Sequence, residues 1–411
     1  MRTAVYGRGA GSTNGARAGL TVTGSIVLQD QSSADEPARA ARVIWLLLGP
    51  KAGDNAQVQA LAEALVARGG FRAETRTLRF HGAELLTQAL RRPHTLGLAP
   101  SARAALGLPD SVRSAASGPD LVLAAGRRSE PVARAIRAAS GGRTRIVHLG
   151  RPWAHPSAFD LVITSSQYDV PNGDNVLPLP LPLTAATGVV SSLPVAGQQG
   201  LAAAPGAPGP ELPFAWLPRP WTGVLVGGNS GYLRFDAERA RTMARALNSA
   251  RAAAGGAWLV VGSPRTPSAF LEVLGAGLEQ PLFLHPFSRA GSNPYRAVLA
   301  SADRLVVTSD SVSMVLEAIA SGRPTYLHDV RPLEADWWRH PGEYRWQALS
   351  HRAVQALAPR RLRRDVRRLH ADLVARGSAR WLTDGFVPFT PVPIDPAAAL
   401  KVAVDRVLGL F

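Results

Sequence analysis

A run of hydroxyl and carboxylate residues, Thr308–Gly322 (TSDSVSMVLEAIASG), follows the apolar stretch RLVV and opens a predicted helix. Ser311 and Ser313 would lie near the helix N-terminus, where backbone N–H groups and the helix dipole favour an anion such as phosphate. Ser313 and Glu317 share a helix face. This pattern suits a nucleotide, with its diphosphate at the helix start and its ribose hydroxyls on Glu317. It also suits a plain helix, because Ser and Asp are ordinary N-caps and Glu317 could be a solvated surface residue.

Two more loops of similar chemistry follow apolar runs in the same half of the chain. They are Gly227–Gly231 (GGNSG), after TGVLV, and Gly262–Thr266 (GSPRT), after AWLVV. In an open parallel sheet, ligands bind outside the carboxyl ends of the strands, so the three loops would meet at one edge. The predicted nucleotide-binding residues are Gly227, Gly228, Asn229, Ser230, Arg265, Ser309, Asp310, Ser311, Ser313 and Glu317.

The first half of the chain holds a comparable loop, Gly49–Leu65 (GPKAGDNAQVQALAEAL), directly after the apolar run VIWLLL. Apolar residues at helical spacing follow the glycines and predict a strand–loop–helix unit. Such a loop suits an anion, and it equally suits a tight turn. Arg127 and Arg128 follow a second apolar run, DLVLAA, and could either pair with a phosphate or be solvated loop residues.

Short apolar runs alternate with helical patterns in two stretches of the chain, which predicts an α/β fold with parallel sheets covered on both faces. A stretch rich in Pro, Ala and Gly separates them. We expect two domains that meet at a cleft. The predicted organisation is an extension that is disordered or wrongly assigned (1–40), a first α/β domain (41–183), a linker (184–220), a second α/β domain (221–358) and a helical tail (359–411).

Composition excludes several classes of protein. The chain has no cysteine, which excludes disulfides and thiol catalysis. No apolar run reaches about 18 residues, so no membrane span is expected, and no secretory signal is expected in residues 1–40. His81, His148 and His155 lack metal-ligand spacing, so no metal is predicted. The net charge of +16 comes mostly from arginine and favours anionic partners, although no nucleic-acid-binding motif is visible.

The arginine-rich stretch 360–376 carries apolar residues at partial helical spacing. A basic helix with an apolar stripe could bind an anionic membrane surface, and it could also pack on the domains. Packing is the favoured interpretation. The stripe consists of Leu362, Val366, Leu369 and Leu373.

Five blocks of the chain, in the same order, resemble the mitochondrial-fission elongated-mitochondria family. They are GPKAGDNAQVQALAEAL, GRRSEPVARAIRAASGGRTRIVHL, LVGGNSG, GSPRTP and TSDSVSMVLEAIASGRPTYL, and the match runs from Val43 to Trp346. The resemblance implies a glycosyltransferase B-type fold, in which two Rossmann-like domains face a cleft. Bacterial members are regarded as nucleotide-sugar glycosyltransferases. The plant member is regarded as an adaptor that recruits a dynamin-related protein to mitochondria.

A more distant resemblance is to the N-acetylglucosaminyltransferase that completes the peptidoglycan lipid precursor. Its Gly-Gly-Ser loop is similar to Gly227, Gly228 and Ser230. Its nucleotide-binding helix is similar to the stretch with Ser311, Ser313 and Glu317. That enzyme carries a histidine in its N-terminal glycine-rich loop where this chain has Asp54.

The second resemblance implies that Asp54 is the candidate catalytic base, since a carboxylate can accept the proton of an acceptor hydroxyl. Capping of the helix by Asp54 is the alternative, and both roles could hold. The other predicted acceptor-side residues are Gly53, Asn55, Gln57, Arg127 and Arg128.

The expected function is that of a bacterial, cytoplasmic glycosyltransferase that needs neither metal nor cofactor. Its donor would be a nucleotide sugar. Its acceptor is unknown and could be lipid-linked, which would suit a peripheral membrane contact. A non-catalytic adaptor with the same fold is the alternative.

Overall fold

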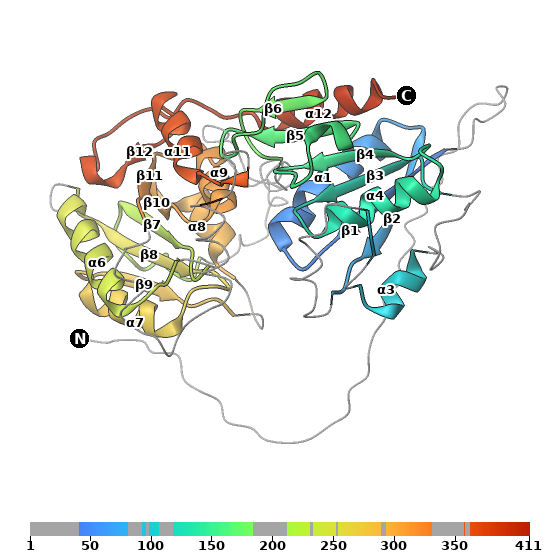
Figure 1. Cartoon of the computed structure of the whole chain (residues 1–411). Helices are drawn as coiled ribbons and strands as arrows, with labels where there is room; N and C mark the ends of the chain where they lie inside the picture. Colours follow the sequence, from blue (N-terminus) through green and yellow to red (C-terminus); the bar gives the residue numbers. More distant parts are fainter. Residues whose placement is uncertain are drawn as a thin grey trace, which may run out of the picture. The chain divides into compact units, whose positions relative to one another are not determined.

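A computed structural model of the chain describes residues 41–80, 93–95, 98–106, 118–183, 212–230, 233–251, 254–288, 293–330, 357 and 362–411. All of these lie in one compact unit, Ala40–Phe411. The predicted extension 1–40, residues 184–211 of the predicted linker, and His81 lie outside the described residues. The described residues form two six-stranded parallel sheets (Figure 1), which confirms the α/β fold with two Rossmann-like sheets.

The first sheet has the strand order β2-β1-β3-β4-β5-β6. This is a doubly wound order, in which the chain starts near one edge, fills that edge with β2 and then turns to the other side with β3. The strands are β1 (Arg42–Leu48), β2 (Phe71–Thr77), β3 (Leu121–Ala125), β4 (Arg145–Leu149), β5 (Leu161–Ser165) and β6 (Val176–Leu179). The switch in direction falls between β1 and β3.

Alternate residues of these strands point to opposite faces, and each face has its own apolar cluster. One cluster joins the sheet to helix α1 (Ala52–Ala67) and to the C-terminal helix α12 (Pro396–Leu408). The other joins the sheet to α3 (Pro100–Ala105) and α4 (Ser129–Ala139). The first core is therefore built partly from the last residues of the chain.

The second sheet has the order β9-β8-β7-β10-β11-β12, counted from its β9 edge. Numbered along its own strands, this is 3-2-1-4-5-6, the Rossmann order, with the switch point between β7 and β10. The strands are β7 (Trp221–Val226), β8 (Ala257–Gly262), β9 (Leu282–His285), β10 (Arg304–Thr308), β11 (Thr325–His328) and β12 (Arg380–Trp381). The predicted helical tail thus also supplies the edge strand β12.

Helices cover both faces of the second sheet as well. Helices α6 (Ala237–Arg251) and α7 (Ser268–Gly277) pack on one face. Helices α8 (Tyr295–Ser301), α9 (Val312–Ala320) and α11 (Val366–Ala375) pack on the other. Phe214, within the predicted linker, is fully buried in the same cluster as α9 and α11.

The apolar stripe of the basic tail is part of this second core. Leu369 and Leu373 of α11 are 0% and 1% exposed. The stripe therefore packs on the second domain, as the favoured interpretation predicted. Its buried leucines are not available to insert into a membrane. Within the part of the chain that the structure describes, none of the helices combines the length and apolar character of a membrane span.

Candidate functional site

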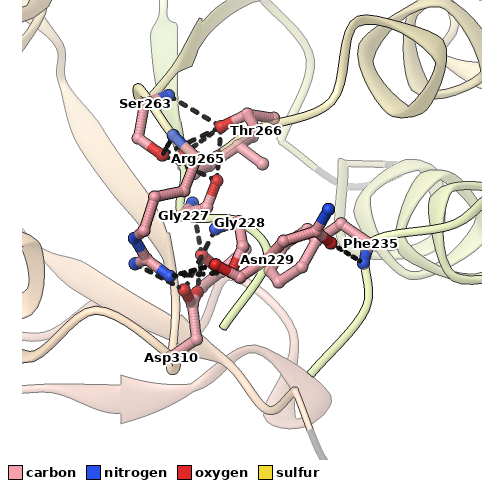
Figure 2. A network of polar contacts seen from close by, with 10 residues as sticks. Gly227, Gly228, Asn229, Phe235, Ser263, Arg265, Thr266 and Asp310 are labelled. Atoms are coloured by element: carbon pink, nitrogen blue, oxygen red, sulfur yellow. Dashed lines mark hydrogen bonds and ion pairs between the residues drawn. The ribbon is translucent and has the colours of Figure 1, made fainter. Parts of the chain in front are cut away.

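The carboxylate of Asp310 is the centre of a polar network just past the carboxyl end of β10 (Figure 2). Its side chain is 0% exposed. It accepts hydrogen bonds from the Gly228 N–H at 3.0 Å and from the Thr308 hydroxyl at 2.7 Å. It also pairs with Nη2 of Arg265 at 2.9 Å. The buried charge is thus both paired and hydrogen-bonded, as a buried charge must be to persist.

Further bonds tie the loops after β7, β8 and β10 to one another. The Thr308 hydroxyl accepts from the Gly227 N–H at 2.7 Å. Arg265 Nη1 donates to the carbonyl oxygens of Gly228 and Asn229 at 2.8 and 3.2 Å. The Ser263 hydroxyl donates to the Gly227 carbonyl at 2.8 Å, and Thr266 contacts the same oxygen. These bonds fix the edge of the sheet at its switch point.

The two glycines of this network are required by packing within the protein. A Cβ added at Gly227 would overlap with the carboxylate of Asp310. A Cβ added at Gly228 would overlap with the backbone of Arg265. Close approach of a ligand is therefore not needed to explain either glycine. Gly227, Gly228, Asn229, Arg265 and Asp310, all predicted as nucleotide contacts, lie together but bond chiefly to one another.

Gly227→Ala is expected to lower the free energy of unfolding by about 1–3 kcal/mol, the usual cost of overpacking a well-packed site. Denaturant titration measures this cost. The matched control is Gly53→Ala in α1, where an added Cβ has no atom within 4 Å. That change is expected to be neutral or stabilising by up to about 1 kcal/mol, because alanine is the better helix former.

A double-mutant cycle tests the assigned cause of the Gly227 cost. In an Asp310→Ala background the overlapping carboxylate is gone, so Gly227→Ala should cost less than in the wild type. Equal costs in both backgrounds would contradict the assignment of the glycine to the Asp310 contact.

Helix α9 presents one polar face outside this network. Six of its residues are buried in the core: Val312, Met314, Val315, Leu316, Ala318 and Ile319. Ser313 is exposed and Glu317 is half-buried. Ser311 is the N-cap residue, and its side chain makes no capping hydrogen bond. Ser309 instead lies below the surface, where its hydroxyl accepts from the Val330 N–H at 2.9 Å. The predicted pair Ser313 and Glu317 is thus placed on the open face of the helix.

The side chain of Glu317 has a partner that the sequence did not indicate. The Tyr295 hydroxyl of α8 donates to Oε2 of Glu317 at 2.7 Å. Burial raises the pKa of Glu317, and the hydrogen bond from Tyr295 and the charge of Arg296 offset part of that rise. Burial also raises the pKa of Tyr295, and the charge of Glu317 adds to the rise, so the hydroxyl stays protonated and acts as the donor. The carboxylate of Glu317 is therefore partly buried and held in place by Tyr295. The alternative that Glu317 is a solvated surface residue is wrong.

In the first half, the loop after β1 is closed by a side chain. Asn55 accepts from the Gly49 N–H at 2.9 Å and donates to the Gly49 carbonyl at 2.8 Å. The predicted ligand contact Asn55 therefore bonds to its own loop. Gln57 reaches the Gly53 carbonyl at 3.4 Å, which is a weak bond.

Asp54 is not the N-cap of α1. The N-cap is Lys51, which makes no side-chain capping bond, and Asp54 is the third residue of the helix. The capping alternative for Asp54 is therefore wrong. A Cβ added at Gly126, which has φ +76°, would lie 2.6 Å from Oδ2 of Asp54. The carboxylate thus lies against the loop after β3, the loop that continues into Arg127 and Arg128.

Several residues of the site were missed by the sequence reasoning. Thr308 ends a predicted strand, and Ser263 and Thr266 lie in a predicted loop. Their positions at the carboxyl edge of the sheet could therefore have indicated the site. Nothing in the sequence indicated Tyr295, because it is 22 residues from Glu317 and lies on another helix. The prediction that Gly49–Asn55 and Gly227–Gly231 face each other across a cleft stays a prediction, as does a site without metal or cofactor.

Comparison with known proteins gives two curated relatives. The Arabidopsis thaliana mitochondrial fission protein ELM1 is 28% identical over 219 residues, which cover 50% of this chain and 50% of that protein. The uncharacterized protein RP120 of Rickettsia prowazekii is 28% identical over 109 residues, which cover 26% of this chain and 31% of that protein. The chain thus spans half or less of the length of these relatives.

Many solved structures are similar to the chain, among them two that match it over most of its length. The UDP-GlcNAc 2-epimerase from Neisseria meningitidis bound to UDP-GlcNAc is 11% identical, with coverage of 89% of this chain and 100% of that one and a TM-score of 0.45. MurG of Acinetobacter baumannii is 12% identical, with coverage of 89% and 91% and a TM-score of 0.41. At these scores, the description of the fold rests on the strand orders given above.

A family profile also matches the sequence. The profile described as mitochondrial fission ELM1 matches residues 52–344, which is more than half of the chain. The matched region begins at α1, contains the loops after β3, β7, β8 and β10, and ends beyond β11. The chain belongs to the mitochondrial fission ELM1 family.

Proposed function

We propose that the protein binds a nucleotide sugar at the switch point of its second sheet and transfers the sugar to an acceptor held by the first half. One observation carries this proposal. The Ser313–Glu317 face of α9 stays outside the core, beside the hydrogen-bonded network of the loops after β7, β8 and β10, at the place where doubly wound sheets bind nucleotides.

The binding roles follow from the chemistry of this face. The first-turn N–H groups of α9 donate no capping hydrogen bond to the Ser311 side chain, so they can donate to a phosphate. Glu317 can accept from ribose hydroxyls, and the bond from Tyr295 holds its carboxylate in place. Ser230, in the loop after β7, also has a buried hydroxyl without a hydrogen-bond partner among the described residues.

The proposed step is a substitution at the anomeric carbon of the sugar. An acceptor hydroxyl oxygen forms the new bond to that carbon, and the bond to the phosphate oxygen of the donor breaks. The electron pair leaves with the nucleoside diphosphate. The hydroxyl proton passes to Asp54, the proposed base. We place this activity in the cytoplasm of a bacterium, as expected from the sequence.

Glu317→Ala is expected to weaken nucleotide binding by about 1–3 kcal/mol, because the carboxylate would no longer accept from the ribose hydroxyls. Helix content should hardly change. Isothermal titration with a panel of nucleoside diphosphates measures the loss, and thermal shift first identifies the preferred base.

Tyr295→Phe is the control variant for this experiment. It keeps the carboxylate and removes one donor, so it should weaken nucleotide binding less than Glu317→Ala does. Because that donor favours the charged carboxylate, its loss should also raise the pKa of Glu317 further. Unaltered nucleotide binding in Glu317→Ala would return the face of α9 to a purely structural role.

A non-catalytic adaptor is the second candidate function. The observation that favours it is the match to a relative named as a mitochondrial fission protein. In this case the two sheets would carry a binding surface for another protein. A wild-type protein that neither binds nor hydrolyses any nucleotide sugar would favour the adaptor over the transferase.

A further inference from the structure

Basic and polar residues follow four neighbouring strands at the carboxyl edge of the first sheet. Lys51 follows β1, Arg127 and Arg128 follow β3, and Arg151 follows β4. Gln167 and Tyr168 follow β5. Because the strands are parallel, these positions share one edge, and the first of them flank the switch point between β1 and β3.

A fifth cation reaches this edge from far along the chain. Arg364 precedes α11 and forms an isolated antiparallel bridge with Tyr168. Its Nε donates to Oε1 of Gln167 at 2.9 Å. Arg151 lies 5.7 Å from the centre of the Tyr168 ring and donates to the Leu362 carbonyl. Arg151 and Arg364 therefore both contact the short segment Gln167–Tyr168.

The five cations, Lys51, Arg127, Arg128, Arg151 and Arg364, form what we call the cation cluster. Burial lowers the pKa of Lys51; Asp54 opposes this, while Arg127, Arg364 and Arg128 lower the pKa further. Burial likewise lowers the pKa of Arg151, with Arg364 and Arg127 adding to the effect. Lys51 nevertheless keeps solvent-exposed surface. Like charges at this proximity repel, and an anion bound among them would relieve the repulsion.

A small recess adjoins the cluster. It is lined by Gln57, Gly150, Thr164 and Tyr168, among others. Thr164 is 6% exposed, and its hydroxyl has no hydrogen-bond partner among the described residues. Since buried hydroxyls are normally hydrogen-bonded, an unpaired one at the wall of a recess indicates a place for a polar group of a ligand.

We propose that the cation cluster binds a phosphate or pyrophosphate group, and that the acceptor of the proposed transfer is therefore a phosphorylated molecule. The statement about the acceptor rests on the proposed function, whereas the statement that the cluster binds phosphate does not. A group with two or more negative charges matches a cluster of several guanidinium groups and one ammonium group. The phosphate would belong either to a soluble sugar phosphate or to a lipid pyrophosphate.

Binding of inorganic pyrophosphate to the full chain tests whether the cluster binds phosphate. Titration calorimetry at low salt should show binding to the wild type that weakens as salt rises. Lys51→Gln should raise the dissociation constant about tenfold, and the double variant Lys51→Gln, Arg128→Gln about a hundredfold. The matched control is Arg143→Gln, which removes an exposed guanidinium before β4, at the opposite edge of the same sheet, and should change binding less than twofold.

Two further arms identify the source of the phosphate. Wild-type protein that binds phosphatidylcholine vesicles only when they contain a polyprenyl pyrophosphate, and that is released by free pyrophosphate, supports the lipid-linked source. Binding of a sugar 1-phosphate that depends on Lys51, without vesicle binding, supports the soluble source. Thermal unfolding of every variant checks that the fold is kept.

The failures of the two proposals are distinguishable. Equal pyrophosphate affinity in the wild type, Lys51→Gln and the double variant overturns the cation cluster as a site, even if nucleotide binding still depends on Glu317. Pyrophosphate binding that depends on Lys51, in a protein that binds no nucleotide, keeps the phosphate site and removes the transferase.

Discussion

Replacing Asp54 by asparagine is expected to leave donor binding intact and to lower turnover by about 10²–10⁴-fold, the usual contribution of positioned proton transfer. Asparagine keeps the shape of the side chain but cannot accept the proton of an acceptor hydroxyl. Because no acceptor is known, slow hydrolysis of the nucleotide-sugar donor serves as the measured reaction.

The structure makes this experiment sharper than the sequence alone allowed. Since Lys51 and not Asp54 is the N-cap of α1, Asp54→Ala should not show the loss of about 0.5–2 kcal/mol that follows removal of a cap. Asp54→Ala and Asp54→Asn should therefore lose activity alike and stay folded alike. Glu63→Gln, an exposed carboxylate on the same helix, is the control and should keep the wild-type rate.

Donor hydrolysis at the wild-type rate in Asp54→Asn, together with its loss in Glu317→Ala, would show that Asp54 is not the base. The base would then be sought among the three histidines considered from the sequence. His148 is 0% exposed and so is closed to an acceptor. His155 is exposed at its ring and would be tested next.

Acidification from about pH 7.5 to pH 4 is expected to lower the free energy of unfolding by about 3 kcal/mol for each of two buried histidines. Burial lowers the pKa of His148 to about 4, and the backbone of Arg151 offsets only part of this shift. Burial also lowers the pKa of His370 to about 4, with smaller opposing effects from Asp329 and Asp365 and added ones from Arg364 and Arg367.

The direction follows from where each proton binds. The pKa of histidine in the unfolded chain is about 6.5. Below this pH the unfolded chain binds protons that the folded protein does not bind, so the free energy of unfolding falls as the pH drops. The loss ends near pH 4, where the folded protein is protonated as well. Urea titrations across this range measure it.

The variants His148→Gln and His370→Gln each remove one titrating group. Each should flatten the dependence of stability on pH by about 3 kcal/mol between pH 7.5 and 4, whatever it does to stability at neutral pH. The two reductions should add, since His148 packs on Phe159 in the first half and His370 on Trp381 in the second. An unchanged slope in either variant would contradict the assignment.

The central strands were predictable because parallel strands covered on both faces read as continuous apolar runs. β1 and β7 are examples, as VIWLLL and WTGVLV. The edge strands β2 and β6 of the first sheet were not. β2 reads FRAETRT and is mostly exposed, and β6 contains Pro178. Helix caps depend on local chemistry alone: Asp236 directly precedes α6, and its Oδ1 accepts from the Arg239 N–H at 3.0 Å.

Local spacing placed Ser313 and Glu317 correctly, because their relation depends only on the helix that contains both. It could not show that Arg265 and Asp310 bind each other across 45 residues, since that pairing depends on the order of β7, β8 and β10 in the sheet. The same limit hid Arg364, which reaches the first sheet from a segment 197 residues beyond Gln167.

The packing of α12 on the first sheet has a consequence for how the protein is made. All six strands of that sheet end before residue 180, but Ala403, Val404 and Val407, near the end of the chain, complete the cluster around α1. Arg68 and Asp405, 2.7 Å apart, add an ion pair between the two helices. During elongation the part of the apolar surface of α1 that contacts α12 therefore stays uncovered while more than 200 further residues are added. A nascent chain needs protection from aggregation for that whole interval, although its first sheet is already synthesised.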